Sequence, residues 1–269
     1  MSFAKSHYEN FPVISLFINK QFRKHVAIIY SFARSADDIA DEGTFNIEEK
    51  ISSLNEFENG LSNCFNGVYA SSFWAALHNT VLKFSIDQNL FFNLLKAFKQ
   101  DLLKSRYADF NEVLDYCKNS ANPVGRIILQ LHGIRDNYAM ELSDKICTAL
   151  QLTNFYQDLS VDLVKDRIYL PLDELNKFRV QIENLLQKKT DENFIELMKY
   201  QVQRNLNLYE EGNKLINILP PKLKIQIKMT IAGGIKILEK VKKIDYNVLK
   251  LRLKLSKFDA VLILLKNLR

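Results

Sequence analysis

Residues 30–41 place several reactive side chains on one side of a predicted helix. Tyr30, Arg34, Asp37 and Asp41 follow one another at spacings of four and three residues. At about 3.6 residues per turn, they share one helical face. Two like charges four residues apart destabilise a helix by about 0.2–0.5 kcal/mol, so their stacking needs a reason. A single pair of this kind is explained well enough by a solvated helix face.

A second stripe of the same kind lies more than a hundred residues later. Asn154, Asp158 and Asp162 are again four residues apart, with Gln157 on the flank of the same face. The neighbouring positions are mostly apolar, so we expect these carboxylates to face an otherwise apolar interior. Two stripes together, each with amide, arginine or tyrosine partners, favour a chemical function over two coincidental surface pairs.

Paired carboxylates on two facing helices suit divalent metal chemistry. Mg²⁺ prefers oxygen ligands and is commonly bound through one or two carboxylates and the phosphate oxygens of a substrate. A diphosphate that bridges such ions becomes a good leaving group, because the metal stabilises its developing negative charge. We therefore predict two or three Mg²⁺ ions, and the predicted ligands are Asp37, Asp41, Asp158 and Asp162.

The elements that must position these side chains are all predicted to be helices. Apolar residues recur every three or four positions, strand-like alternation is rare, and the chain has only 8 Gly and 5 Pro. The expected helices cover residues 20–42, 47–65, 72–85, 87–104, 109–120, 136–165, 191–218 and 222–243. Without repeats or a flexible linker, the sequence predicts one all-α domain over residues 1–269, a helical bundle.

The composition narrows the class of partner. Hydrophobic residues make up 47% of the chain, enough for a large core, and three scattered cysteines indicate a reducing compartment rather than disulfides. The net charge of +6 permits an anionic partner such as a diphosphate, but interspersed acids give no reason to expect nucleic acid. No signal peptide or membrane-spanning stretch is evident, so we expect a cytoplasmic protein.

At these residues the chain resembles the squalene and phytoene synthases, which join prenyl diphosphates head to head. The resemblance extends over nearly the whole sequence. Its motifs are His7-Tyr-Glu-Asn10-Phe11, the stripe from Tyr30 to Asp41, Asp101-xxxx-Arg106-Tyr107, Tyr116-Cys117, Ala121-Asn-Pro-Val-Gly125, the stripe from Asn154 to Asp162, and Arg167-Ile-Tyr169-Leu-Pro171. It implies an isoprenoid-synthase helical bundle with a central apolar cavity and Mg²⁺ at its mouth.

The resemblance also implies roles for single residues. The four aspartates would bind metal, and His7, Arg34, Asn154 and Arg252 would contact the diphosphate. Tyr30 and Tyr116 would face the reacting carbons, and the cavity residues would be Phe11, Tyr116, Phe155 and Tyr156. Ordinary structural roles are open for three of these residues: His7 as a terminal surface histidine, Tyr116 as a core residue and Arg252 as part of a solvated basic tail.

Two departures from the usual family pattern refine the expected reaction. Condensing relatives usually carry an arginine where this chain has Gln157, and Ala232-Gly233-Gly234 stands where relatives often have a tyrosine. The motifs look most like the hydroxysqualene synthase branch of bacterial squalene and hopanoid pathways. This branch implies that presqualene diphosphate and water give hydroxysqualene and diphosphate. Tyr30, Asn154 and Gln157 are candidates to orient the water.

Other functions remain open at this point. The first is the condensation of farnesyl diphosphate to presqualene diphosphate, squalene or dehydrosqualene, and the second is a non-catalytic assembly protein of the same fold. No Gly-rich strand–turn–helix unit for NAD(P)H or flavin is evident, so neither cofactor is expected. The basic, apolar tail over residues 250–269 suits either a last helix packed on the bundle or peripheral contact with the inner membrane face and with pathway enzymes.

Overall fold

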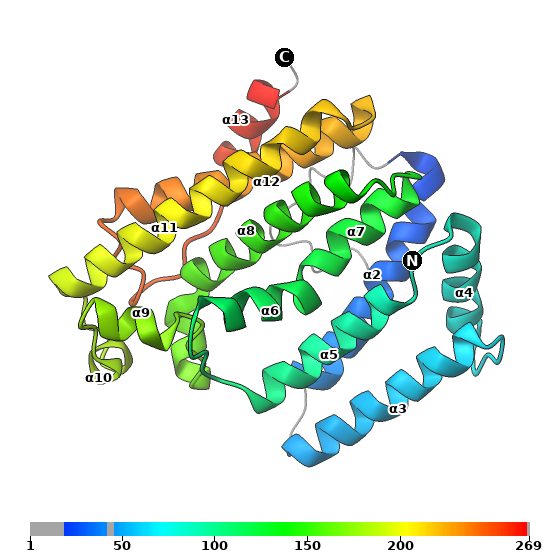
Figure 1. Cartoon of the computed structure of the whole chain (residues 1–269), viewed down its shortest axis with the longest axis horizontal. Coiled ribbons are helices and arrows are strands. Elements are labelled where there is room, and N and C mark those ends of the chain that lie inside the picture. The colour runs from blue at the N-terminus through cyan, green and yellow to red at the C-terminus, as the bar shows by residue number, and fades with distance from the viewer. Residues whose placement is uncertain (1–18, 42–45, 268–269) are drawn as a thin grey trace.

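The computed structural model describes residues 19–41 and 46–267, and its regular elements in these ranges are helices (Figure 1). The α-helices are α2 (Lys20–Asp41), α3 (Ile47–Phe65), α4 (Ser72–Phe84), α5 (Asn89–Leu103), α6 (Phe110–Ser120), α7 (Asn122–Leu131), α8 (Asn137–Asp162), α9 (Leu172–Lys177), α10 (Ile182–Leu186), α11 (Glu192–Gly212), α12 (Pro221–Lys243) and α13 (Lys257–Asn267). Two short 3₁₀ helices, η2 (Leu163–Lys165) and η3 (Asn213–Asn217), follow α8 and α11. An isolated bridge joins Arg106 to Ile168. The predicted all-α fold is confirmed.

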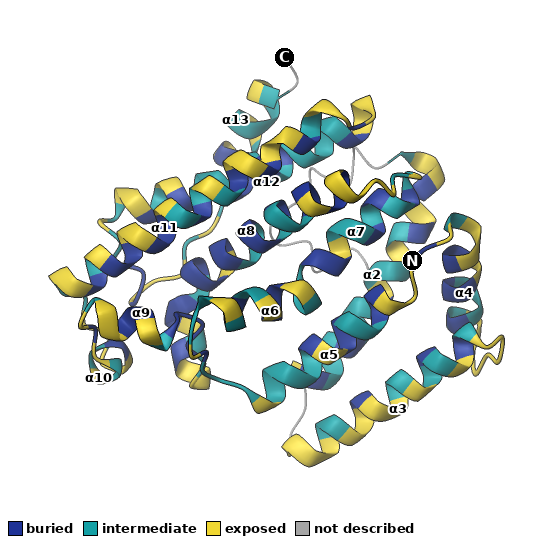
Figure 2. Ribbon diagram, viewed as in Figure 1, coloured by how far each residue is buried: buried dark blue, intermediate teal, exposed yellow. Residues whose placement is uncertain are grey.

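Helix α8 is the central element of the bundle. Helices α6, α7, α11 and α12 all pack against it, and Figure 2 shows buried residues along much of its length. It begins where the Asp136 side chain accepts a hydrogen bond from the Ala139 amide at 2.9 Å. It ends at Asp162, and the 3₁₀ turn that follows closes at Asp166 with a φ of 54°. These boundaries place the second carboxylate stripe on the last two turns of a buried helix.

Helix α2 belongs to a second group of helices, with α3, α4 and α5 packed around it. Phe32, Ala36 and Ala40 on α2 are buried against Leu61 of α3 and Phe91 of α5, among other apolar residues. These buried positions fix one face of α2 against its neighbours. The first carboxylate stripe lies on another face of α2. The residues that pack the helix and the predicted site residues are therefore separate.

Most of the expected helices lie within a few residues of their predicted positions. The expected helix over 191–218 is divided into α11 and the 3₁₀ helix η3. The α-helix ends at Gly212, which packs so closely on α8 that a Cβ there would lie 2.6 Å from Ile146 Cγ1. Helix α7 is not among the expected helices; Pro123 occupies its first turn, which tolerates the missing amide hydrogen. In the described part of the chain, no helix is long and apolar enough to cross a membrane.

Candidate active site

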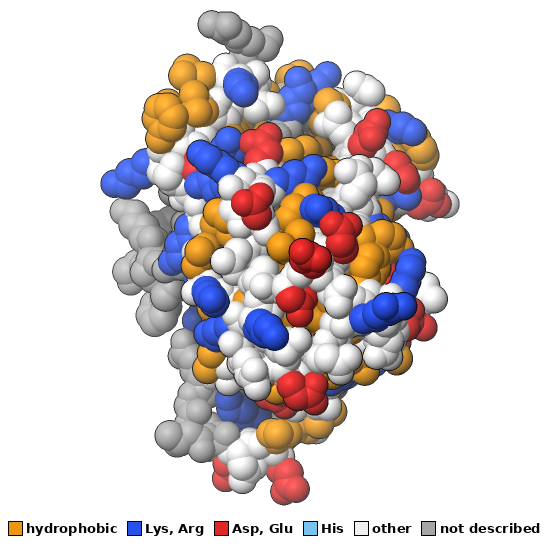
Figure 3. All heavy atoms as spheres, turned by 90° about the vertical axis from the view of Figure 1, so that its left-hand side faces the viewer, with side chains coloured by type: hydrophobic (Ala, Val, Ile, Leu, Met, Phe, Trp, Pro, Cys, Tyr) orange, Lys and Arg blue, Asp and Glu red, His pale blue; other side chains and the backbone are white. Residues whose placement is uncertain are grey.

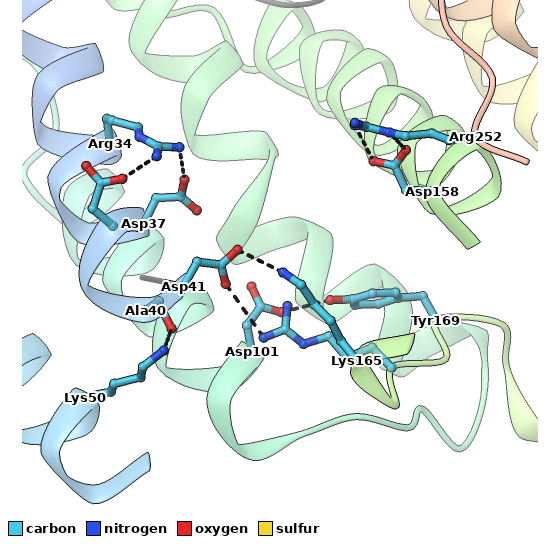
Figure 4. A network of polar contacts seen from close by, with 12 residues as sticks. Arg34, Asp37, Ala40, Asp41, Lys50, Asp101, Asp158, Lys165, Tyr169 and Arg252 are labelled. Atoms are coloured by element: carbon cyan, nitrogen blue, oxygen red, sulfur yellow. Dashed lines mark hydrogen bonds and ion pairs between the residues drawn. The ribbon is translucent and has the colours of Figure 1, made fainter. Parts of the chain in front are cut away.

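The two carboxylate stripes line the same cavity, between the C-terminal parts of α2 and α8. This cavity, called the polar cavity below, has a volume of about 490 Å³. Its lining residues are Asp37, Asp41, Tyr116, Gln151, Asn154, Phe155, Asp158, Asp162, Tyr169 and Arg252. Figure 4 shows Asp37 and Asp41 on one side and Asp158 on the other. The fold therefore brings together carboxylates that are more than a hundred residues apart in the sequence.

On the α2 side, both aspartates are paired with cations. Arg34 Nη1 donates to Asp37 Oδ2 at 2.8 Å, and Lys165 Nζ lies 3.2 Å from Asp41 Oδ2 (Figure 4). Burial, followed by the like charge of Asp41, raises the pKa of Asp37 above its ordinary value. Each carboxylate is thus partly desolvated and beside another acid, which favours the approach of further positive charge.

On the α8 side, Arg252 donates two hydrogen bonds to the carboxylate of Asp158. Its Nε lies 2.6 Å from Oδ1 and its Nη2 lies 3.1 Å from Oδ2. Arg252 belongs to the non-helical segment 244–256 that connects α12 to α13, and this segment brings it to the cavity. Burial, and next the neighbouring charge of Asp158, raise the pKa of Asp162 to about 6.

The donor set fits hard divalent cations that arrive with a diphosphate. Within residues 19–41 and 46–267, no group of three or more His, Cys, Asp or Glu side chains is close enough together to hold a metal ion. The carboxylates instead come in one pair on each helix around a shared polar cavity. Mg²⁺ is commonly held by one or two carboxylates, with water and phosphate oxygens completing its shell, and this arrangement provides for that. The pKa values of Asp37 and Asp162 are raised first by burial and next by the neighbouring carboxylates of Asp41 and Asp158, so a bound cation would relieve the repulsion within each pair.

One wall of the polar cavity is a cluster of aromatic rings around Asp101. Tyr116 and Tyr169 donate their hydroxyl hydrogens to Asp101 at 2.8 and 3.3 Å. The rings of Phe155 and Tyr169 stack with centroids 3.8 Å apart. Burial raises the pKa of Asp101 to about 6, although both tyrosines oppose that rise. Asp101 and Tyr169 had appeared in the sequence only as parts of motifs, because nothing in their spacing along the chain shows that they meet.

A smaller cavity of about 250 Å³, the apolar cavity, lies on the other side of Asn154. Its lining residues are Leu150, Thr153, Asn154, Gln157, Gly233, Gly234, Ile237 and Leu255. Asn154 lines both cavities, and the buried Gln157 lines only the second of them. The two glycines leave the α12 wall without side chains beside α8. The site therefore combines a charged compartment with a mostly apolar one.

Several predicted site residues lie elsewhere. Tyr156 does not line either of these two cavities: its ring is buried and its hydroxyl donates to Gln201 on α11 at 2.9 Å. It is adjacent in sequence to Phe155, and a helix turns successive side chains about 100° apart. Tyr30 and Arg34 lie on α2 but are not among the lining residues of either cavity. His7 and Phe11 lie outside the described residues.

Comparisons with known proteins agree on one family. The family model described as squalene/phytoene synthase matches residues 4–259. A hydroxysqualene synthase from Sinorhizobium fredii is 30% identical over 96% of this chain and 87% of its own length. A hydroxysqualene synthase from Rhodopseudomonas palustris is 32% identical over 79% of this chain and 72% of its own length.

Solved structures show the same fold. The squalene synthase HpnC from Alicyclobacillus acidocaldarius superposes with a TM-score of 0.85 at 33% identity, over 90% of this chain and 91% of that one. A dehydrosqualene synthase crystallised with a ligand also has a TM-score of 0.85, at 23% identity, over 99% of this chain and 93% of that one. The second likeness concerns the fold alone.

Proposed function

The chain belongs to the squalene/phytoene synthase family, and we propose that it converts presqualene diphosphate and water into hydroxysqualene and diphosphate. The observation that carries this proposal is the polar cavity, in which two aspartate pairs from α2 and α8 face one another beside an apolar compartment. The names of the hydroxysqualene synthases from S. fredii and R. palustris favour this reaction within the family.

The chain's own cations would bind and orient the diphosphate. Arg252 lines the polar cavity, and its planar guanidinium can exchange Asp158 for phosphate oxygens with the same two-pronged geometry. Lys165 holds Asp41 and is half-exposed, so it too is placed to meet an incoming anion. When bound through Asp37, Asp41, Asp158 and Asp162, Mg²⁺ would neutralise the negative charge that develops on the departing diphosphate.

Departure of diphosphate with both electrons of the C–O bond leaves a carbocation beside the aromatic wall of the polar cavity. The faces of aromatic rings stabilise a nearby cation by about 0.5–2 kcal/mol, and Tyr116, Phe155 and Tyr169 form such a wall. The exclusion of bulk water protects this cation from premature capture. The rings thus act as a fixed electrostatic surface that takes no part in bond making.

Capture of the cation needs one water molecule at a defined place. Asn154 and Gln157 are the polar side chains in contact with the apolar cavity, together with the Thr153 hydroxyl. Thr153 already bonds to Ala149, Tyr209 and Asn205, so its hydrogen-bonding capacity serves the packing of the helices. Asn154 and Gln157 are therefore the groups we propose to orient the water, whose oxygen forms the new C–O bond while its proton leaves to solvent.

Incubation with presqualene diphosphate, Mg²⁺ and ¹⁸O-labelled water tests this function. We expect a C30 alcohol that carries the label, identified by mass spectrometry, together with released diphosphate. Asp115→Ala, which removes an exposed carboxylate paired only with Lys118 in the described structure, provides a control with normal turnover. A hydrocarbon product, or an alcohol without the label, would overturn the proposed reaction.

The alternative within the family is the condensation of farnesyl diphosphate itself. Phytoene synthases also resemble this chain, for example that of Narcissus pseudonarcissus at 29% identity over 95% of it. Incubation with Mg²⁺ and farnesyl diphosphate as the sole substrate distinguishes the two. Our proposal predicts no C30 product, whereas presqualene diphosphate or dehydrosqualene would favour condensation.

A further inference from the structure

The C-terminal helix α13 packs against α12 and leaves apolar side chains in solvent. Phe258, Val261 and Leu265 are 70%, 51% and 59% exposed. Their spacing of three and four residues puts them on one stripe of the helix. A surface helix of a globular protein normally turns such a stripe toward the core, so an exposed apolar stripe on α13 is unusual.

Polar contacts fix the orientation of α13. Asp259 is the acidic residue of α13 and is buried. It accepts from Lys240 of α12 at 2.5 Å and from the amide and hydroxyl of Ser256 at 2.7 and 2.6 Å. Burial alone would raise the pKa of Asp259, but these donors lower it to about 2. Asp259 is therefore held inward against α12, which leaves the apolar stripe outward while Lys257 and Lys266 stay exposed.

The surroundings of the stripe are basic. Lys250, Arg252, Lys254, Lys257 and Lys266 lie between residues 247 and 267, and the acidic residue of that segment is the buried, neutralised Asp259. Figure 3, in which α13 lies at the top, shows apolar side chains next to Lys and Arg there. Apolar side chains flanked by lysines suit the boundary between the headgroups and acyl chains of an anionic lipid surface.

The same segment forms part of the site. Arg252 lines the polar cavity and Leu255 lines the apolar one, and both come directly before α13. A surface that binds α13 would therefore lie close to the wall of the compartment that holds the hydrocarbon. This link to the site distinguishes the exposed apolar residues of α13 from those elsewhere in the described chain, such as Val68 or Leu82.

We propose that the outward stripe of α13 docks on an anionic lipid bilayer and holds the apolar cavity beside it, so that the isoprenoid product passes directly into lipid. The docking surface stands on the exposure and charge of α13. The transfer of product rests on the proposed function, because it requires an apolar product.

Co-sedimentation with vesicles tests the docking surface without any turnover. The full chain is mixed with vesicles of phosphatidylcholine alone, or of phosphatidylcholine mixed with phosphatidylglycerol. We expect binding to the mixed vesicles and little to the neutral ones. The variant F258S/V261S/L265S should bind at least about tenfold more weakly, because it loses the apolar area that would enter the bilayer. The variant K257Q/K266Q should lose about fivefold per lysine and become less sensitive to salt.

Matched controls keep the result specific to α13. I47S/V68S/L82S changes three side chains of similar exposure outside α13, and K96Q/K222Q removes two exposed lysines elsewhere; both should bind as the unchanged chain does. Thermal melting confirms that each variant is folded. Equal binding by the α13 variants and the controls, or no binding to anionic vesicles at all, would overturn the proposal.

Two further measurements separate the possible failures. If α13 instead pairs with a second copy of this chain, light scattering will show a dimer that F258S/V261S/L265S dissociates while vesicles remain unbound, and the proposal falls. Asp158→Ala should bind vesicles like the unchanged chain, because Asp158 lies in the polar cavity. If the unchanged chain binds vesicles normally but forms no hydroxysqualene, the proposed reaction fails while the docking surface stands.

Discussion

Three of the four aspartates that line the polar cavity are paired with a partly exposed cation. Asp158 is held by Arg252, Asp41 by Lys165 and Asp37 by Arg34, and none of these pairs is fully buried. Partly exposed ion pairs contribute about 0–1 kcal/mol, so exchanging one cation for another costs little. The same arginine or lysine can then turn to the diphosphate. This is why the site can be stable both before and after its charge is rearranged.

Removal of one carboxylate tests the role of the pairs. We expect Asp158→Ala and Asp37→Ala to lower turnover of presqualene diphosphate by about 10²-fold or more, because the developing charge loses its preorganised environment. The side chains are 27% and 41% exposed, so folding should be preserved. Diphosphate release measures the first effect and circular dichroism the second. A folded Asp158→Ala protein with unchanged turnover would exclude this carboxylate from the mechanism, while Asp115→Ala serves as the surface control.

The raised pKa of Asp162 predicts a pH-dependent stability. Its pKa of about 6 exceeds the ordinary 3.8, so the folded state binds this proton more tightly than the unfolded state does. The bound proton on Asp162 therefore adds to the free energy of unfolding below about pH 4, and this contribution is lost as the pH rises to about 6. Asp162→Asn should therefore raise the metal-free melting temperature above about pH 7, by about 2–4 °C if the screened penalty is about 1 kcal/mol.

The gain in melting temperature from Asp162→Asn should disappear near pH 4, because the Asp162 carboxyl is then protonated and is as neutral as the asparagine amide. Asp115→Asn is the comparison, because the pKa of Asp115 is lowered, chiefly by its bond to Lys118, and its loss should give no gain at neutral pH. An Asp162→Asn protein that melts at the same temperature as the unchanged chain at both pH values would contradict the inferred desolvation.

Sequence reasoning at the scale of residues succeeds where periodicity is enough. Asp37 with Asp41, and Asp158 with Asp162, share faces because helical geometry is local, and their shared cavity followed once both helices were placed. Asp101 could not be assigned in this way, since its contacts with Tyr116 and Tyr169 depend on how α5, α6 and the chain after α8 pack together. The contact of Tyr156 with Gln201 of α11 likewise depends on how α8 and α11 pack together, which the sequence pattern does not show.

At the scale of elements, the long helices were predictable and the connections were not. The predicted range of α3 is the observed one, with Asn46 and Glu49 forming a capping box at its start. Helix α7 and the short helices α9 and α10 carry too few turns for a periodic signal. The tail 250–269 was expected as one helix, or else as a membrane contact, yet residues 251–256 are non-helical. That non-helical segment is what brings Arg252 and Leu255 to the two cavities.

The contact between α12 and α11 depends on a glycine. A Cβ at Gly234 would overlap the hydroxyl of Tyr209, which in turn bonds to Thr153 of α8 at 2.9 Å. We expect Gly234→Ala to destabilise the fold by about 1–3 kcal/mol, because the added methyl forces the three helices apart. Thermal melting measures this loss. Tyr209→Phe in the same chain should restore part of it by removing the overlapping oxygen, and a Gly234→Ala protein as stable as the unchanged chain would contradict the packing.

At the scale of the whole molecule, the described residues form two apolar clusters with the polar cavity between them. One cluster lies around α2, α3, α4 and α5, and the other lies around α8, α11 and α12. Helix α7 joins them, since Ile127 belongs to the first cluster and Leu129 to the second. We propose that the chain is nevertheless one domain, because this shared helix and the packing of α5 on α6 couple the two parts.

One aspartate pair lies on α2, in the first group of helices, and the other lies on α8, in the second. A ligand that bridges the two pairs should therefore stabilise the whole chain. Mg²⁺ or diphosphate alone satisfies only part of the site, whereas together they can engage both α2 and α8. At about 100 times the dissociation constant, such binding contributes about 2.7 kcal/mol. With about 2–4 °C per kcal/mol, the melting temperature should rise by about 5–10 °C in a single transition.

Scanning fluorimetry should give much smaller shifts with either ligand alone, and Asp41→Asn or Asp158→Asn should each abolish the joint shift while Asp115→Asn retains it. A full shift with one ligand, or one that survives the loss of the α2 carboxylate, would mean that the two helices do not hold a common ligand.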